Sequence, residues 1–204
     1  MSTLILVRHG ESEWNAENRF TGWVDVALSD KGRREAREGG ERLAAEDHRV
    51  ERAYTSTLQR AIETGQLVLE ALGQDELHQI QAWELNERFY GALTGRNKAQ
   101  TAEEFGEEQV HIWRRSYDTP PPGGESLKDT TARTLPYFDR EIVPATREVD
   151  CVLVSAHGNS LRAIVKELDD ISDENITGLE IPTGVPLVYE MQDGRPVNQR
   201  ILHA

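Results

Sequence analysis

Two short apolar runs, far apart in the chain, each lead toward a histidine followed by glycine. Leu4 to Val7 precedes Arg8-His9-Gly10, and Cys151 to Val154 precedes Ser155 to Gly158. Short runs rich in β-branched residues and followed by polar residues and glycine are typical of buried strands. Ligands collect at the carboxyl ends of strands in open α/β sheets. The pattern therefore predicts that both imidazoles reach one crevice.

The segments between these runs alternate between strand-like and helix-like patterns. Ser29 and Ser126 are suited to cap helices, and Thr119 to Gly124 is a proline- and glycine-rich break. We expect helices over 29–46, 98–115, 126–143 and 161–168, and further strands over 52–55, 78–82 and 187–191. The spacing of Ile62, Leu67, Val68 and Leu72 predicts one more helix, with Arg60 in its first turn. This alternation predicts an α/β fold, and the length of 204 residues fits one domain over residues 1–204.

The charge balance limits the partners of the protein. With 36 acidic and 23 basic residues, the formal net charge is −13, so the mean field repels nucleic acid. Only four of the basic residues are lysines, and the arginines of the motifs are expected to converge on anions. No apolar stretch approaches the roughly 18 residues that cross a bilayer, which predicts no membrane span.

The N-terminal sequence predicts the compartment, and the neighbours of the single cysteine predict its role. Met1 is followed almost directly by a core strand, without the basic and apolar segments of an export signal, so we expect a cytoplasmic protein. Cys151 cannot form an internal disulfide, and its apolar neighbours predict a small buried residue rather than a catalytic thiol.

The Arg8-His9-Gly10 sequence is suited to phosphoryl chemistry. An imidazole can attack phosphorus, a guanidinium can hold phosphate oxygens in a planar fork, and glycine lets the backbone approach a bound group closely. A histidine after a strand is more often a hydrogen-bonded structural residue, but Arg8 and Gly10 favour the functional interpretation. Arg60 lies in the first turn of its helix, where a cation opposes the helix dipole and needs another reason to be present.

Longer motifs extend this interpretation. Arg8 to Glu11, together with His157 to Ser160, resembles the histidine phosphatase superfamily. Further segments resemble the cofactor-dependent phosphoglycerate mutases: Leu6 to Asn15, Asn18 to Trp23, Tyr54-Thr55-Ser56, Leu85 to Gly91, Trp113-Arg114-Arg115 and Ile181 to Glu190. The resemblance covers nearly the whole chain and implies a three-layer sandwich, in which helices flank a mostly parallel central sheet.

The resemblance also implies an activity: interconversion of 3-phosphoglycerate and 2-phosphoglycerate through a phosphohistidine. 2,3-Bisphosphoglycerate would prime the enzyme, and no metal is required. His9 is implied as the nucleophile. His157, if protonated, would stabilise the transferring group together with Arg8 and Arg60. Glu87 is implied as the general acid/base, a role that predicts a raised pKa.

Further residues are implied to bind the anionic substrate. A phosphoglycerate carries a carboxylate and a phosphate, and cations suit both groups. The implied binding residues are Ser12, Asn15, Thr21, Gly22, Arg88, Tyr90, Lys98, Arg114, Arg115, Gly158 and Asn159. By local sequence alone, Arg114 and Arg115 could equally face solvent, and Glu87 is an ordinary helix-edge carboxylate.

Two features depart from the mutase pattern. Pro122-Gly123-Gly124 leads almost directly to Glu125, where the mutases have a longer polar segment, and the sequence stops at Ala204 without a lysine-containing tail. A more open pocket would admit water to a phosphohistidine. A phosphatase acting on phosphorylated small molecules is therefore the alternative, and a non-catalytic anion-binding or scaffold protein is a third hypothesis. The sequence is compatible with a monomer or a homo-oligomer.

Overall fold

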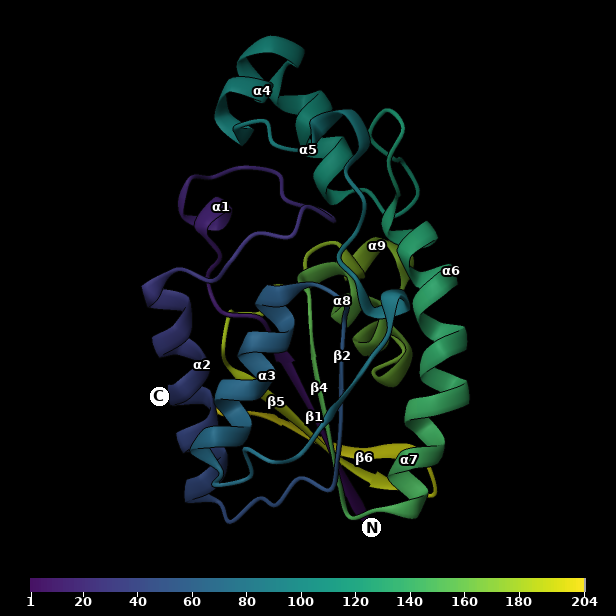
Figure 1. Ribbon diagram of the computed structural model, residues 1–204. Coiled ribbons are helices and arrows are strands. Elements are labelled where there is room, and N and C mark those ends of the chain that lie inside the picture. The colour runs from purple at the N-terminus through teal and green to yellow at the C-terminus, as the bar shows by residue number, and fades with distance from the viewer. Residues whose placement is uncertain (204) are drawn as a thin grey trace.

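A six-stranded sheet forms the centre of the part of the chain that the structure describes, residues 1–203, in a computed structural model (Figure 1). The strand order is β3-β2-β4-β1-β5-β6. The strands are β1 Ser2–Arg8, β2 Arg52–Thr55, β3 Gln79–Gln81, β4 Cys151–Ala156, β5 Pro186–Gln192 and β6 Arg195–Ile201. The first four are parallel, β5 is antiparallel to β1, and β6 is antiparallel to β5. The predicted mostly parallel sheet is confirmed.

Helices cover both faces of the sheet, which gives the three layers that the resemblance implies. The helices are α1 Glu13–Ala16, α2 Asp30–Ala45, α3 Gln59–Ala71, α4 Lys98–Phe105, α5 Glu107–Arg115, α6 Leu127–Tyr137, α7 Val143–Glu148, α8 Gly158–Leu168 and α9 Asp173–Ile176. In Figure 1, α2 and α3 lie on one side of the sheet, and α6, α7 and α8 lie on the other. Within residues 1–203, no helix is long and apolar enough to cross a membrane.

The alternation of side chains along β1 builds a core on each face of the sheet. Leu4 and Leu6 join one buried cluster, which also includes residues of α6 and α8. Ile5 and Val7 join the other cluster, with residues of α2 and α3. β4 is buried along its whole length, so its only cysteine, Cys151, is a small buried core residue as predicted. Burial raises the pKa of this thiol to about 12.

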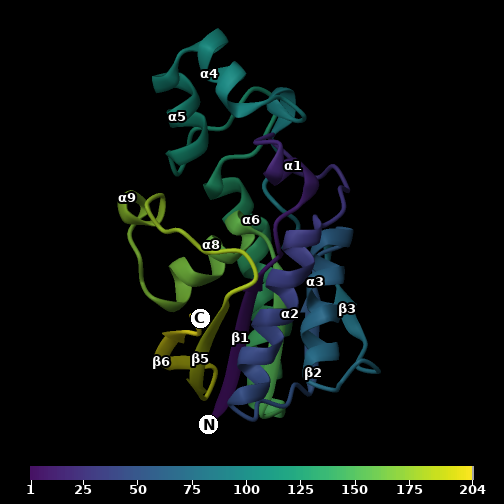
Figure 2. The same ribbon diagram turned by 90° about the vertical axis from the view of Figure 1, so that its left-hand side faces the viewer.

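Helices α4 and α5 stand apart from the sandwich, beyond the end of the sheet opposite the N-terminus, in both Figure 1 and Figure 2. One continuous helix over 98–115 was expected, and this expectation is wrong. Gly106 adopts a φ of +90°, a conformation that glycine reaches more easily than other residues. This angle is not helical, so the segment is broken into two helices. The result is a helical hairpin above the carboxyl ends of the strands.

Other element boundaries also differ from the prediction. Ser29 and Ser126 cap α2 and α6 as expected, each accepting a hydrogen bond from a backbone N–H of the first helical turn. However, the segment after α6 continues through a π-helical Phe138–Ile142 into α7. Helix α8 begins at Gly158, three residues earlier than predicted. β6 was not predicted, because it is a largely exposed edge strand containing Pro196 and several polar residues.

Candidate active site

The register of β1 and β4 places the two histidines beside each other. These neighbouring parallel strands pair Arg8 with Ala156, so His9 and His157 follow at the same level of the sheet. The His9 N–H donates to the Ala156 carbonyl at 2.9 Å. The ring centroids lie 5.0 Å apart, with the planes tilted by 59°. The structure thus brings both imidazoles to one place, as the paired motifs predict.

His9 is held in the tautomer that suits a nucleophile. Its Nδ1 lies 2.6 Å from the Gly10 carbonyl oxygen. Because a carbonyl oxygen only accepts, Nδ1 carries the proton and Nε2 keeps its lone pair. Burial, followed by the positive charges of Arg60 and Arg8, lowers the pKa of His9 well below its ordinary value. A neutral imidazole with an available lone pair can accept a phosphoryl group.

His157 is also neutral, so the condition attached to its predicted role, a protonated imidazole, is not met. Its side chain is fully buried, with Nε2 2.7 Å from Ser56 Oγ. Burial, then the charge of Arg60 and the neighbouring His9, lowers the pKa of His157 well below its ordinary value. A third cation beside the two arginines would be unfavourable in this dry environment. The positive charge beneath the pocket therefore comes from Arg8 and Arg60.

These two arginines line the pocket and are held by backbone carbonyls. Arg60, in the first turn of α3, donates Nη1 to the Val24 carbonyl at 3.0 Å and Nη2 to the Gly22 carbonyl at 2.7 Å. Burial lowers the pKa of Arg60 to about 10, which leaves it charged at neutral pH. Arg8 donates to the Ile181 carbonyl at 2.8 Å. Over the residues described, the Nε of both arginines is buried with no hydrogen-bond partner, so each can serve an anion such as a phosphate.

Glu87 lies beside the histidines and is ionised. Its Oε1 accepts hydrogen bonds from Arg88 N at 2.7 Å, Asn159 Nδ2 at 2.9 Å and Asn159 N at 3.2 Å. Burial alone would raise the pKa of Glu87, but these donors and the charges of Arg60 and Arg8 outweigh it, so the pKa is lowered. The expected raised pKa is wrong for this state of the pocket, since donors to a carboxylate stabilise the charged form.

The pocket above these groups holds about 740 Å³ of space, including its open mouth. Thirteen of the sixteen predicted site residues line it within the described chain: Arg8, His9, Asn15, Thr21, Gly22, Arg60, Glu87, Tyr90, Lys98, Arg114, Arg115, Gly158 and Asn159. Arg19, Arg162 and Glu180 also line it, which makes seven cationic side chains and two carboxylates among residues 1–203. A chain with a net charge of −13 therefore concentrates positive charge in this one pocket.

The other three predicted residues lie behind the pocket wall. Ser12 caps α1, and its Oγ accepts from Asn15 N at 3.1 Å. The Arg88 guanidinium is buried 4.9 Å from the centre of the Tyr90 ring. His157 contacts His9, as described above. Each of these side chains supports a residue that does line the pocket.

Gly10 is required by packing rather than by close approach to a bound group, contrary to expectation. A Cβ at Gly10 would lie 2.1 Å from the Gly32 carbonyl oxygen in the first turn of α2. Gly10 does not line the pocket. Its N–H donates to Thr64 Oγ1 at 3.1 Å, which ties the loop after β1 to α3. The glycine thus lets this loop pack closely between two helices.

Three pocket residues were missed by sequence reasoning. Glu180 Oε1 lies 2.5 Å from Arg115 Nη2, and Oε2 lies 3.7 Å from Arg162 Nη2. Arg162 lies one helical turn after Gly158 on α8, so helical spacing could have identified it. Arg19 lies within a motif segment, but no role was assigned to it. Nothing in the local sequence signals Glu180, which reaches Arg115 only through the fold.

The chain is similar to known proteins of one enzyme family. Residues 4–202 match the histidine phosphatase superfamily (branch 1), and the chain belongs to this family. A solved structure, a mycobacterial glucosyl-3-phosphoglycerate phosphatase in complex with VO3, is similar with a TM-score of 0.83 and 25% identity over 98% of this chain and 97% of that one.

Curated relatives then point to one member of the class. The 2,3-bisphosphoglycerate-dependent phosphoglycerate mutase of Parvibaculum lavamentivorans is 55% identical over 93% of this chain and 90% of its own length. The protein of the same name from a Caulobacter species is 50% identical over 100% of this chain and 96% of its own length.

Proposed function

We propose that this chain is a 2,3-bisphosphoglycerate-dependent phosphoglycerate mutase, which interconverts 3-phosphoglycerate and 2-phosphoglycerate in glycolysis and gluconeogenesis. One observation carries the proposal: a neutral His9 and an ionised Glu87 share one pocket with a surplus of cations. A phosphoglycerate brings a reacting phosphate, a hydroxyl and a second anionic group. The relatives at 50% and 55% identity carry the same function in their names.

His9 accepts and returns the phosphoryl group. Its Nε2 lone pair attacks phosphorus, which divides one difficult transfer into two easier ones. The phosphoryl group that primes His9 is supplied by 2,3-bisphosphoglycerate. Arg8 and Arg60 stabilise the charge on the transferring group, and their unpartnered Nε–H groups provide donors that need no rearrangement. The uncharged His157 packs beside His9 and fixes the ring position.

Glu87 moves the proton of the substrate hydroxyl. As a carboxylate, it takes this proton while the hydroxyl oxygen attacks phosphorylated His9. In the second half-reaction, the protonated Glu87 returns the proton to the departing oxygen, so the cycle has no net proton change. The lowered pKa favours the first of these states when no substrate is bound.

The cations further from the histidines bind the remaining anionic group. Lys98, Arg114 and Arg115 lie on α4 and α5 and line the pocket. Asn15, Thr21 and the other predicted binding residues add hydrogen bonds. Thr21 Oγ1 is buried without a partner over the described residues, as expected of a group that binds a ligand.

A coupled enolase assay from 3-phosphoglycerate, with and without catalytic 2,3-bisphosphoglycerate, tests the proposal. Strong stimulation with little phosphate release is expected. Phosphate release without isomerisation would instead support the phosphatase, an alternative favoured by the name of the mycobacterial structure and by the short 122–124 connection.

Three further expectations belong to the same proposal. Activity should survive a chelator in the mutase step, because the resemblance to the mutases implies a reaction without a metal. The enzyme should be found in the cytoplasmic fraction. Residues 1–204 should unfold in one transition as one domain, and sedimentation should distinguish the monomer from a homo-oligomer.

A further inference from the structure

We infer that the ion pair of Arg133 and Glu125, which lies outside the pocket, positions the Glu87 carboxyl group for proton transfer. The inference rests on the proposed acid/base role of Glu87. Neither member of the pair lines the pocket, so both act through the segment that carries Glu87.

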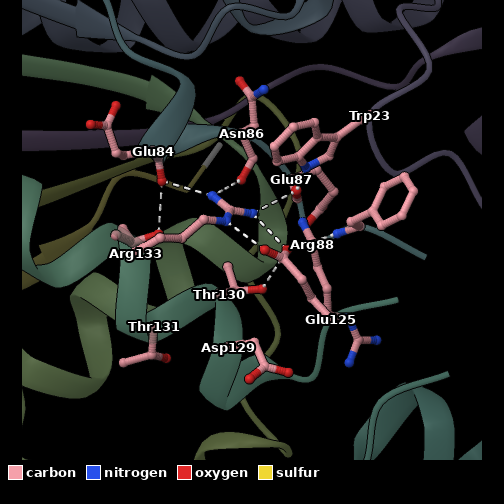
Figure 3. Close-up of polar contacts among 12 residues, drawn as sticks. Trp23, Glu84, Asn86, Glu87, Arg88, Glu125, Asp129, Thr130, Thr131 and Arg133 are labelled. Atoms are coloured by element: carbon pink, nitrogen blue, oxygen red, sulfur yellow. Dashed lines mark hydrogen bonds and ion pairs between the residues drawn. The ribbon is translucent and has the colours of Figure 1, made fainter. Parts of the chain in front are cut away.

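Arg133 of α6 uses all five of its N–H donors (Figure 3). Nε and Nη2 donate to the two carboxylate oxygens of Glu125 at 2.8 and 2.9 Å. Nη1 donates to the carbonyls of Glu84 and Asn86 at 2.8 and 3.0 Å, and Nη2 donates to the carbonyl of Glu87 at 2.9 Å. A planar guanidinium is the only side chain that offers five donors in a fixed arrangement.

Glu125 holds the other end of the same segment. Its Oε2 accepts from Phe89 N at 2.9 Å and from Thr130 Oγ1 at 3.3 Å. The backbone is therefore fixed on both sides of Glu87. Arg133 binds the carbonyls of the residues up to and including Glu87, and Glu125 binds the amide of Phe89 after it. The Arg133 side chain is only 9% exposed, which strengthens these charge-assisted bonds.

The Glu87 carbonyl has a second donor. Trp23 Nε1 donates to it at 2.5 Å, and the Trp23 ring lies 5.5 Å from the Arg133 guanidinium carbon. At the other end of the residue, the Glu87 Oε1 is bound by Asn159. Backbone and carboxylate are thus anchored separately, and the Arg133 network provides the backbone anchor.

Loss of this anchor should reduce chemistry more than binding. A displacement of about 1 Å in a catalytic group can cost about 100-fold in rate. Arg133→Lys keeps the charge but offers three donors instead of five, so some of the carbonyls and the Glu125 carboxylate lose a partner. Glu125→Gln keeps the shape and removes the charge. Both changes leave the pocket lining intact.

The test compares phosphoryl donors that differ in their need for a general acid. We would measure phosphorylation of His9 by 2,3-bisphosphoglycerate, phenyl phosphate and p-nitrophenyl phosphate. Of these donors, only p-nitrophenyl phosphate has a leaving group that needs little protonation. In Arg133→Lys, the rates with 2,3-bisphosphoglycerate and phenyl phosphate should fall about 10- to 100-fold, and the rate with p-nitrophenyl phosphate by no more than about 2-fold. For 3-phosphoglycerate, kcat should fall while KM changes little.

Two controls separate positioning from folding. Arg140→Lys changes an exposed arginine that forms an ion pair with its neighbour Glu141 and lies over the Tyr137 ring, and it should leave all three rates unchanged. Glu125→Gln should repeat the pattern if Arg133→Lys does not fold. Equal loss with every donor, or no loss, would overturn the inference. If the wild type accepts phosphate from the aryl donors but not from 2,3-bisphosphoglycerate, the mutase proposal fails, whereas the aryl comparison still tests Arg133.

Discussion

The two ends of the pocket are built differently. We name one end the histidine floor, formed by Arg8, His9, Arg60 and Glu87 with His157 behind them. We name the other end the cationic rim, formed by Arg19, Lys98, Arg114, Arg115 and Glu180. Arg8, His9 and His157 lie at strand ends, Arg60 lies in the first turn of α3, and Glu87 lies in the connection after β3. Most of the rim lies on the α4–α5 hairpin and on loops above the sheet (Figure 2).

Burial separates the two ends. His157 is 0% and Arg60 is 1% exposed, whereas the side chains of Arg115 and Glu180 are 30% and 64% exposed. On the floor, burial lowers the pKa values of His9, His157 and Arg60. On the rim, Arg19 and Arg115 are partly exposed and pair with the carboxylates of Glu17 and Glu180. Charge that develops during a reaction needs preorganised buried groups, while recognition of an anion is possible with partly solvated cations.

Removal of the nucleophile should produce the largest effect. His9→Gln removes the phosphoryl acceptor at the floor, so kcat should fall by at least about 10⁴-fold, a typical scale for loss of a nucleophile. His111→Gln, an exposed histidine on α5 of the hairpin, should retain activity. Quenched-flow detection of phosphohistidine checks both variants. Appreciable turnover by His9→Gln would contradict the assignment of the nucleophile.

The two regions should also differ in stability. Leu153 is fully buried on β4 in one of the two large clusters, whereas Leu93 belongs to a cluster of three buried residues, with Phe20 and Val110, beside the hairpin. Leu153→Ala should lower the free energy of unfolding by about 3–5 kcal/mol, and Leu93→Ala by about 2 kcal/mol. Urea unfolding measures both. Equal losses would show that the small cluster beside the hairpin is packed as firmly as the large cluster under the floor.

Truncation of a rim cation should weaken binding rather than chemistry. Arg115→Ala removes a charge-assisted contact worth about 1.5–3 kcal/mol, so KM should rise about 10- to 100-fold with a small change in kcat. Arg37→Ala, an exposed position on α2, is the matched control. Steady-state kinetics with 3-phosphoglycerate distinguish the two cases. A fall in kcat with constant KM would move Arg115 into the chemical step.

Acid should destabilise the floor. The folded pKa values of His9 and His157 lie below the unfolded value of about 6.5, so below that pH the unfolded state binds protons that the folded state does not. The contribution of these neutral histidines to the free energy of unfolding is fully present above about pH 6.5. It decreases as the pH is lowered, by up to about 1.4 kcal/mol per pH unit for each histidine. Urea unfolding between about pH 7 and pH 5 should give a shallower slope for His9→Gln than for the wild type. Identical slopes would contradict the lowered pKa.

Relief of the rim ion pair should have the smallest effect. Glu180 competes with a bound anion for Arg115 and Arg162. Glu180→Gln should therefore lower KM by a few-fold, equivalent to about 0.5–1 kcal/mol for an exposed pair. The difference from the wild type should shrink at high salt. An unchanged or increased KM would show that Glu180 positions the arginines instead.

The fold was predictable where the signal is local. The apolar runs of β1 and β4 and the caps Ser29 and Ser126 gave correct elements. β6 was missed because an exposed edge strand lacks apolar alternation. The break at Gly106 was missed because a single glycine in a polar helical pattern does not show which φ it will adopt.

The site divides in the same way. Local patterns brought Arg8, His9 and His157 to one edge of the sheet, because the strand before each histidine is a local signal and parallel strands end at the same edge. The resemblance to the mutases supplied most of the other predicted residues that line the pocket, such as Glu87, Arg114 and Arg115. Tertiary structure decided the neutral state of His157, the ionised state of Glu87, the Glu180 pair and the five bonds of Arg133. Burial and hydrogen bonds between segments far apart in sequence set these properties, and no local pattern encodes such contacts.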